Sequence, residues 1–141
     1  MAGVFDGHGS SGKEASNAAQ ENFHKYFDSN MKKIVKLDLK ESKDSFIYEA
    51  FEVVERQMIK SGIDYNYSGT CASLVFIKDD ICTIANLGDS RAVLCRTNKD
   101  INAIELSWDH KPTRKEEKSR ILLNGGKVEK LNYNGDWIGP Y

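Results

Sequence analysis

The chain has 141 residues, of which 40% are hydrophobic and 29% are charged, and its formal net charge is −1. This length favours one domain with a real core, and the composition argues against a disordered chain. The near balance of 20 basic and 21 acidic residues gives no electrostatic footprint for nucleic acid or an anionic membrane. No apolar run approaches the ~20 residues that span a bilayer, and the first residues do not resemble a signal peptide.

The cysteines are odd in number and widely spaced, and each lies in an apolar segment: Cys71, Cys82 and Cys95. This pattern predicts reduced thiols in the core rather than a disulfide or a metal site. Reduced thiols in turn favour a cytoplasmic or nuclear location.

Two amphipathic helices are predicted in the first half of the chain. A glycine-rich turn at 7–12 leads into the first, where Ser11 and Glu14 fit a capping box. The second covers about 45–60 and stops before Gly62, and the short polar connection between them predicts an antiparallel pair. Apolar residues recur at helical spacing in both helices: Ala15, Ala18, Ala19, Phe23, Tyr26, Phe27, Met31 and Ile34 in the first, and Phe46, Ile47, Ala50, Phe51, Val54 and Met58 in the second.

The second half reads mainly as strands. Apolar runs at 70–77, 81–87 and 92–95, joined by turns at 78–80 and 88–90, predict an antiparallel meander covered on both faces. One more strand is expected at 101–106. A capping box at 113–116 then opens a short helix that stops at 124–126. A final strand is expected to begin within 127–131, and no closing element follows it.

The glycine-rich turn has two competing interpretations. Residues 7–12 match GxGxxG, follow a strand and open a helix, as in a dinucleotide-binding fingerprint. That fold needs a parallel strand after the helix, ending in an acidic residue, whereas here a second helix is predicted. Asp28, the acidic residue nearest to the position that the fingerprint requires, falls within the predicted helix end rather than at a strand end.

The other interpretation centres on Asp6 and His8. Residues i and i+2 of an extended segment point to the same side, so both side chains could reach one pocket. A carboxylate suits Mg²⁺ or Mn²⁺, and a histidine can donate a proton to a leaving oxygen near neutral pH. Taken singly, the two residues fit equally well an aspartate that caps a turn and a histidine that faces solvent.

Four ordered blocks resemble the motifs of the type-2C protein phosphatases, which are metal-dependent serine/threonine phosphatases. The blocks are VFDGHG at 4–9, SGTCA at 68–72, NLGDSR at 86–91 and DHKP at 109–112, the last followed by a charged helix and Gly125–Gly126. The resemblance covers nearly the whole chain, and four ordered motifs are far more specific than DGHG alone.

The resemblance implies a role for several residues. In this family the aspartate of DGHG bridges two Mg²⁺ or Mn²⁺ ions, which assigns that role to Asp6. The carbonyl oxygen of the next glycine, here Gly7, binds one ion, and the histidine, here His8, protonates the leaving serine or threonine. Asp89 would help to hold a third, weaker ion, although it also fits an ordinary turn aspartate. The block at 109–111 is interpreted as structural.

The same resemblance implies the reaction and the fold. A water activated by two cations would hydrolyse phosphoserine and phosphothreonine in protein substrates, without a phosphoenzyme or a cysteine nucleophile. The implied fold is α+β, a partial four-layer α-β-β-α sandwich of antiparallel sheets flanked by helix pairs. Residues 1–141 would form one partial catalytic domain, acting as a monomer.

The chain also departs from the family pattern. Members carry earlier strands with a phosphate-binding arginine and an acidic pair, and later segments with two more metal-binding aspartates. Because Mg²⁺ takes about six oxygen ligands, we expect a fragment with an incomplete metal site and little activity alone. Three further carboxylates, those of Asp79, Asp80 and Asp136, lie in predicted turns that do not point toward Asp6. The alternative is a non-catalytic pseudophosphatase or regulatory fragment, against which the intact Asp6 and His8 argue.

Overall fold

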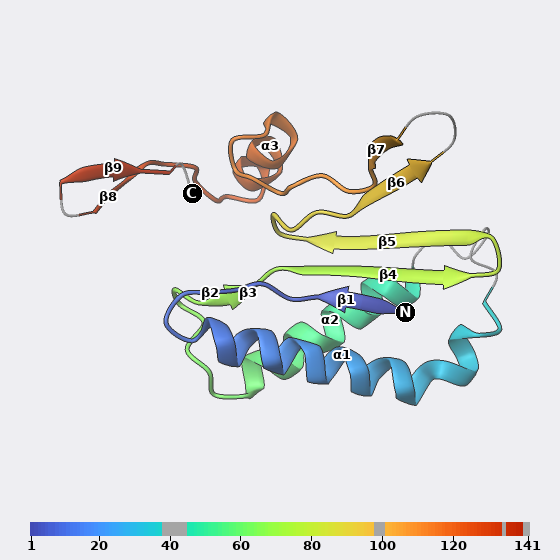
Figure 1. The fold of residues 1–141 in the computed structure, drawn as a ribbon. Helices are drawn as coiled ribbons and strands as arrows, with labels where there is room; N and C mark the ends of the chain where they lie inside the picture. The colour runs from blue at the N-terminus through green and yellow to red at the C-terminus, as the bar shows by residue number, and fades with distance from the viewer. Residues whose placement is uncertain (38–44, 98–100, 134, 140–141) are drawn as a thin grey trace.

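The structure is a computed structural model that describes residues 1–37, 45–97, 101–133 and 135–139. The predicted connection between the first two helices and the last two residues, 140–141, lie outside this part. Helices α1 (Gly12–Ile34) and α2 (Ser45–Lys60) pack against each other along one sheet (Figure 1). The second helix begins and ends where the apolar spacing and Gly62 predict.

The sheet against which these helices pack is antiparallel. In the described part it contains β1 (Ala2–Val4), β4 (Ala72–Lys78) and β5 (Ile81–Leu87), in the order β1-β4-β5. A tight turn at 79–80 joins β4 to β5, and their register pairs residue 72 with 87 and residue 78 with 81. The two strands and the turn between them are therefore confirmed.

The third strand of the predicted meander forms, but its predicted pairing with the second strand is wrong. Strand β6 (Val93–Thr97) pairs with β7 (Ile101–Glu105) and, within the described residues, not with β5. The cause lies just before β6: the Ala92 amide donates to the Ser107 hydroxyl at 2.9 Å, and its carbonyl accepts from the Leu106 amide at 2.9 Å. These bonds align the strand with the segment after β7. All of β6 is exposed, so the expected cover on both faces is also wrong there.

The C-terminal part contains more structure than the sequence predicts. Helix α3 (Lys115–Leu123) ends at Asn124 and Gly125, as expected. The last strand was expected to begin within 127–131, and it begins at the end of that range, as β8 (Leu131–Tyr133). It pairs with β9 (Asp136–Ile138), which the sequence did not predict. Asp136 therefore opens a strand and does not lie in a turn. In Figure 1 these elements lie beyond β5, away from α1.

Both predicted capping boxes are wrong. Ser11 is the N-cap of α1, yet its side chain makes no capping bond to the described residues. The tertiary structure satisfies the turn instead, because the Ser11 amide donates to the Ser68 hydroxyl at 3.0 Å. For α3 the N-cap is Arg114 rather than Thr113, and again no side-chain capping bond forms in the described part.

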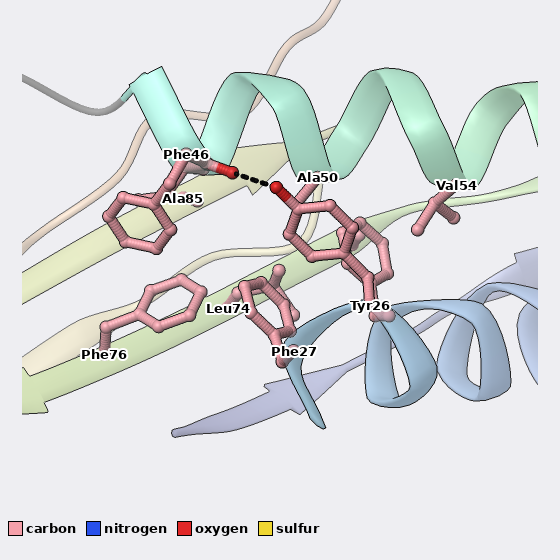
Figure 2. Packing of buried hydrophobic residues seen from close by; sticks show 11 residues of the cluster. Tyr26, Phe27, Phe46, Ala50, Val54, Leu74, Phe76 and Ala85 are labelled. Atoms are coloured by element: carbon pink, nitrogen blue, oxygen red, sulfur yellow. Dashed lines mark hydrogen bonds between the residues drawn. The ribbon is translucent and has the colours of Figure 1, made fainter. Parts of the chain in front are cut away.

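The core lies between the helix pair and the sheet and is rich in aromatic rings (Figure 2). Phe27, 2% exposed, packs edge-on against Phe76 of β4 at 5.1 Å between ring centroids. The Tyr26 hydroxyl donates to the Phe46 carbonyl oxygen, and burial, followed by Glu49, raises the pKa of Tyr26. The predicted stripes are largely confirmed, although Met31 is exposed. The buried cluster comprises Phe23, Tyr26, Phe27, Phe46, Ile47, Ala50, Val54, Ala72, Leu74, Phe76 and Ala85.

The opposite face of the sheet is partly open, as expected for a partial sandwich. Val4 and Ile77 are 61% and 70% exposed, and a groove of about 410 Å³ separates this face from β6. The α+β class with antiparallel sheets is confirmed, with one helix pair covering one sheet. In the described part, no helix is long and apolar enough to cross a membrane.

The cysteines are free thiols among the described residues, as predicted, but they are not core residues. Cys71 is half-buried, whereas Cys82 and Cys95 are exposed. The predicted burial is therefore wrong, most clearly for the latter two. Both lie in strands whose outward face is not covered in the described part.

Candidate active site

The Asp6–His8 segment lies where β1 leaves the sheet. Gly7 and His8 form β2 (Gly7–His8), which pairs with β3 (Gly69–Thr70) in the register Gly7 with Thr70 and His8 with Gly69. The Asp6 carbonyl oxygen accepts a hydrogen bond from the Cys71 amide at 2.8 Å, so the backbone is held on both sides of Gly7. Asp6, Gly7 and His8 are all exposed, as a site open to substrate requires.

The imidazole of His8 lies across the backbone of Gly69. A Cβ placed on Gly69 would come within 3.0 Å of His8 Nε2 and 3.1 Å of its Cε1. Any larger residue at position 69 would therefore crowd the ring. A side chain at position 69 would therefore move the imidazole by a few tenths of an ångström or more.

The glycine-rich turn is packed tightly against its surroundings. At Gly9, φ is +80°, and an added Cβ would meet the Tyr67 carbonyl oxygen at 2.1 Å. The Gly12 amide donates to the Gly9 carbonyl oxygen at 3.1 Å, and the preceding amide, that of Ser11, donates to the Ser68 hydroxyl at 3.0 Å. These helix-start amides are thus already satisfied by protein oxygens. A second helix follows α1, so neither the amides nor the topology supports dinucleotide binding.

Asp89 follows the tight turn that ends β5. At Gly88, φ is +96°, and an added Cβ would lie 2.3 Å from Cys71 Sγ, so only glycine fits this approach. The Cys71 thiol donates to Asp89 Oδ1 at 3.3 Å. Cys71 thus bonds to both predicted metal-binding segments, through its amide to Asp6 and through its thiol to Asp89.

The DHKP block holds the Asp89 turn in place. The His110 amide donates to the Gly88 carbonyl oxygen at 3.0 Å, and the Gly88 amide donates back to His110 Nδ1 at 3.4 Å. The Arg91 guanidinium donates to Asp109 Oδ1 at 2.8 Å, and this bond, with help from Lys111, holds the pKa of Asp109 below its usual value. These contacts support the structural role predicted for the block.

The remaining predicted carboxylates are not brought to the site. Asp79 and Asp80 form the turn at the far end of the β4–β5 hairpin, about 20 Å along the strands from the end that carries Asp89. Asp136 lies in the β8–β9 hairpin. Over the described ranges, no three histidine, cysteine or acidic side chains gather closely enough to hold a metal ion.

The two turns that Cys71 joins offer donors with the chemistry of a hard-cation site. The Asp6 carboxylate, the Gly7 carbonyl and the Asp89 carboxylate all offer oxygen, the ligand that Mg²⁺ and Mn²⁺ prefer. Mg²⁺ also keeps several waters when proteins bind it, so a few exposed protein oxygens fit such an ion. The contacts of Cys71 with Asp6 and Asp89 were missed by sequence reasoning, because no local pattern marks a thiol that bonds to a distant aspartate.

Comparisons with known proteins agree with the motifs. The family model described as Protein phosphatase 2C matches residues 1–137. The chain is 39% identical over 135 residues to "Probable protein phosphatase 2C 14" of Arabidopsis thaliana, covering 96% of this chain and 27% of that protein. It is 32% identical over 143 residues to "Protein phosphatase 1L" of Bos taurus, covering 96% of this chain and 36% of that protein.

The chain therefore spans about a quarter to a third of the length of these relatives. A solved structure of a serine-threonine phosphatase 2C from Toxoplasma gondii superimposes with a TM-score of 0.63 at 24% identity, covering 96% of this chain and 48% of that one. That likeness bears on the fold. The match of the family model over residues 1–137 shows that the chain belongs to the protein phosphatase 2C family.

Proposed function

We propose that this chain forms part of the catalytic site of a Mg²⁺- or Mn²⁺-dependent phosphatase that acts on phosphoserine and phosphothreonine in proteins. The observation that carries the proposal is the meeting of two segments at Cys71. Its amide bonds to the Asp6 carbonyl oxygen and its thiol to Asp89 Oδ1. Two carboxylate-bearing turns, far apart in the sequence, are thereby held on the same residue. Family membership supports the same reaction.

The chain's own oxygens supply the cation ligands in this proposal. The Asp6 carboxylate and the Gly7 carbonyl hold the tighter ions, and Asp89 holds a weaker one. When bound, such cations offset phosphoryl charge and make a water more acidic. Because three protein groups fall short of about six ligands per ion, we expect the 141 residues to bind cations weakly and to release phosphate slowly.

His8 is the proposed proton donor to the leaving oxygen. Its ring is exposed and lies over Gly69, so a substrate can approach it, while pairing of β2 with β3 fixes its backbone. Histidine is the side chain that most often serves as a general acid or base in enzymes. General acid catalysis of this kind contributes roughly 10²–10⁴-fold to a rate.

The test separates binding from chemistry. Mn²⁺ binding would be measured by calorimetry, and phosphate release would be measured with a phosphothreonine peptide, with EDTA as the blank. Asp6→Asn should abolish both, whereas His8→Asn should keep Mn²⁺ binding and lower the rate by roughly 10²–10⁴-fold. Asp80→Asn, an equal change at the far end of the hairpin, should alter neither.

Two results would contradict the proposal: Mn²⁺ binding that is indifferent to Asp6, or phosphate release that persists in EDTA. If the 141 residues bind Mn²⁺ through Asp6 but release no phosphate, phosphate release by the same variants should be measured in a chain extended at both ends. Inactivity of that longer chain would favour the non-catalytic alternative, a binding protein that keeps the scaffold.

A further inference from the structure

The positively charged ammonium group of Lys111 lies beside the Asp89 carboxylate. One oxygen, Oδ1, accepts the Cys71 thiol, and the other, Oδ2, lies 4.0 Å from the Lys111 ammonium. Asp89 and Lys111 are about equally exposed, 54% and 53% of each side chain, so both can exchange partners with solvent. A proposed cation ligand thus already faces a positive charge from its own chain.

The position of Lys111 is built into the fold. Its ammonium also lies 3.5 Å from Oδ2 of Asp109, whose carboxylate is only 15% exposed and is held by Arg91. The neighbouring residue, His110, bonds to the Gly88 backbone in both directions. The segment that carries Lys111 is therefore fastened to the turn that carries Asp89, which keeps the ammonium close to that carboxylate.

We propose that Lys111 is an internal counter-ion that sets the affinity and the salt dependence with which Asp89 takes a divalent cation. This inference rests on the proposed function, in which Asp89 is a cation ligand. Without a metal ion, the ammonium is shared by Asp89 and Asp109. When a metal ion occupies Asp89, the ammonium retains Asp109, whose second oxygen already accepts from Arg91. Lys111 and the metal ion compete for one carboxylate.

The size of the effect follows from the distance. A unit charge about 4–6 Å from a divalent ion in water opposes its binding by roughly ten- to thirtyfold. Screening by salt weakens this repulsion, since the Debye length falls to about 3 Å at 1 M ionic strength. Neutralising Lys111 should therefore tighten cation binding at low salt and have little effect at high salt.

The experiment is a Mn²⁺ titration of the 141-residue chain, with free Mn²⁺ measured by electron paramagnetic resonance at low and at 1 M salt. Asp89→Asn identifies the binding that depends on Asp89. Lys111→Met should tighten that component by about ten- to thirtyfold at low salt only, and Lys111→Arg should resemble the natural chain. Lys115→Met, which removes an equal charge at the exposed start of α3, is the matched control and should change nothing.

The outcomes are distinguishable. Equal or weaker Mn²⁺ binding by Lys111→Met, or an identical gain in Lys115→Met, would overturn the counter-ion role. Binding that is lost in Asp6→Asn but unchanged in Asp89→Asn would also overturn it, while leaving the part of the proposed function that rests on Asp6 intact. Binding indifferent to all three variants, Asp6→Asn, Asp89→Asn and Lys111→Met, would count against both proposals.

Discussion

A matched pair of glycine substitutions tests how tightly the turn after His8 is packed. Gly9 and Gly62 have nearly the same positive φ, 80° and 77°, so alanine meets similar backbone strain at both positions. At Gly9 the added methyl would lie 2.1 Å from the Tyr67 carbonyl oxygen and 2.7 Å from the Ser68 Cα, whereas at Gly62 no described atom lies within 4 Å. Only Gly9→Ala must therefore displace backbone.

The expected magnitudes follow from these distances. Left-handed strain costs about 1–2 kcal/mol at either position, and forcing packed backbone apart adds about 1–3 kcal/mol at Gly9 alone. Gly62→Ala should thus lower the free energy of unfolding by about 1–2 kcal/mol and Gly9→Ala by about 2–5 kcal/mol. For a chain of 141 residues, each kcal/mol corresponds to roughly 3–5 °C in Tm.

Urea unfolding followed by circular dichroism would measure both variants, together with Mn²⁺ affinity. Gly9→Ala should also weaken Mn²⁺ binding, because the turn that it displaces adjoins Asp6–His8, whereas Gly62→Ala at the end of α2 should not. Equal losses of stability in the two variants would refute the close approach of the turn to the 67–68 backbone.

Two further predictions concern the core and the DHKP block. Phe27→Ala removes a ring that is 2% exposed and should lower the free energy of unfolding by about 3–5 kcal/mol, measured by urea unfolding; a loss below about 1 kcal/mol would show that the core of Figure 2 is not formed. Asp109→Asn tests the lowered pKa of Asp109, which Arg91 chiefly causes. Because the pKa of Asp109 is lower in the folded chain than in the unfolded chain, its ionised carboxylate stabilises the fold at pH values above the ordinary pKa of 3.8. This stabilisation is lost as the pH falls through the lowered pKa. The urea midpoint of the variant should therefore lie below that of the natural chain between about pH 5 and 8 and converge with it below about pH 4; a gap that does not change with pH would contradict the Arg91 contact.

Local features of the sequence predicted local features of the fold. The bounds of α2 follow from apolar spacing and a terminal glycine, and the β4–β5 hairpin follows from two apolar runs around a polar turn. Both depend only on residues close in the chain. The capping boxes were local too, yet both are wrong. At α1 the reason is tertiary, because the Ser68 hydroxyl, from a distant loop, accepts from the Ser11 amide in the turn before the helix. Tertiary contacts can replace a cap that the local sequence predicts.

Strand pairing could not be predicted in the same way. An apolar run such as β6 can pair with a strand on either side. The alternation of apolar and polar residues indicates which face of a strand is buried, but not which strand lies next to it. The choice of β7 depends on bonds from Ala92 to Leu106 and Ser107, which follow β7. Exposure of Cys82 and Cys95 was missed for a related reason. The apolar composition of a strand shows that it can be buried, but it does not show which of its faces other parts of the chain bury.

The four motifs that identify the family form one chain of contacts in space. The Asp6 carbonyl accepts from Cys71, Cys71 reaches the turn of Gly88 and Asp89, and that turn is held by the DHKP block. Glycine is required where Cys71 meets this turn, because a Cβ added to Gly88 would lie 2.3 Å from Cys71 Sγ. The sequence revealed the carboxylates, the histidine and the glycines separately. Their contacts give Gly88 a structural role: it lets the turn that carries Asp89 approach Cys71, which also bonds to the Asp6 carbonyl oxygen.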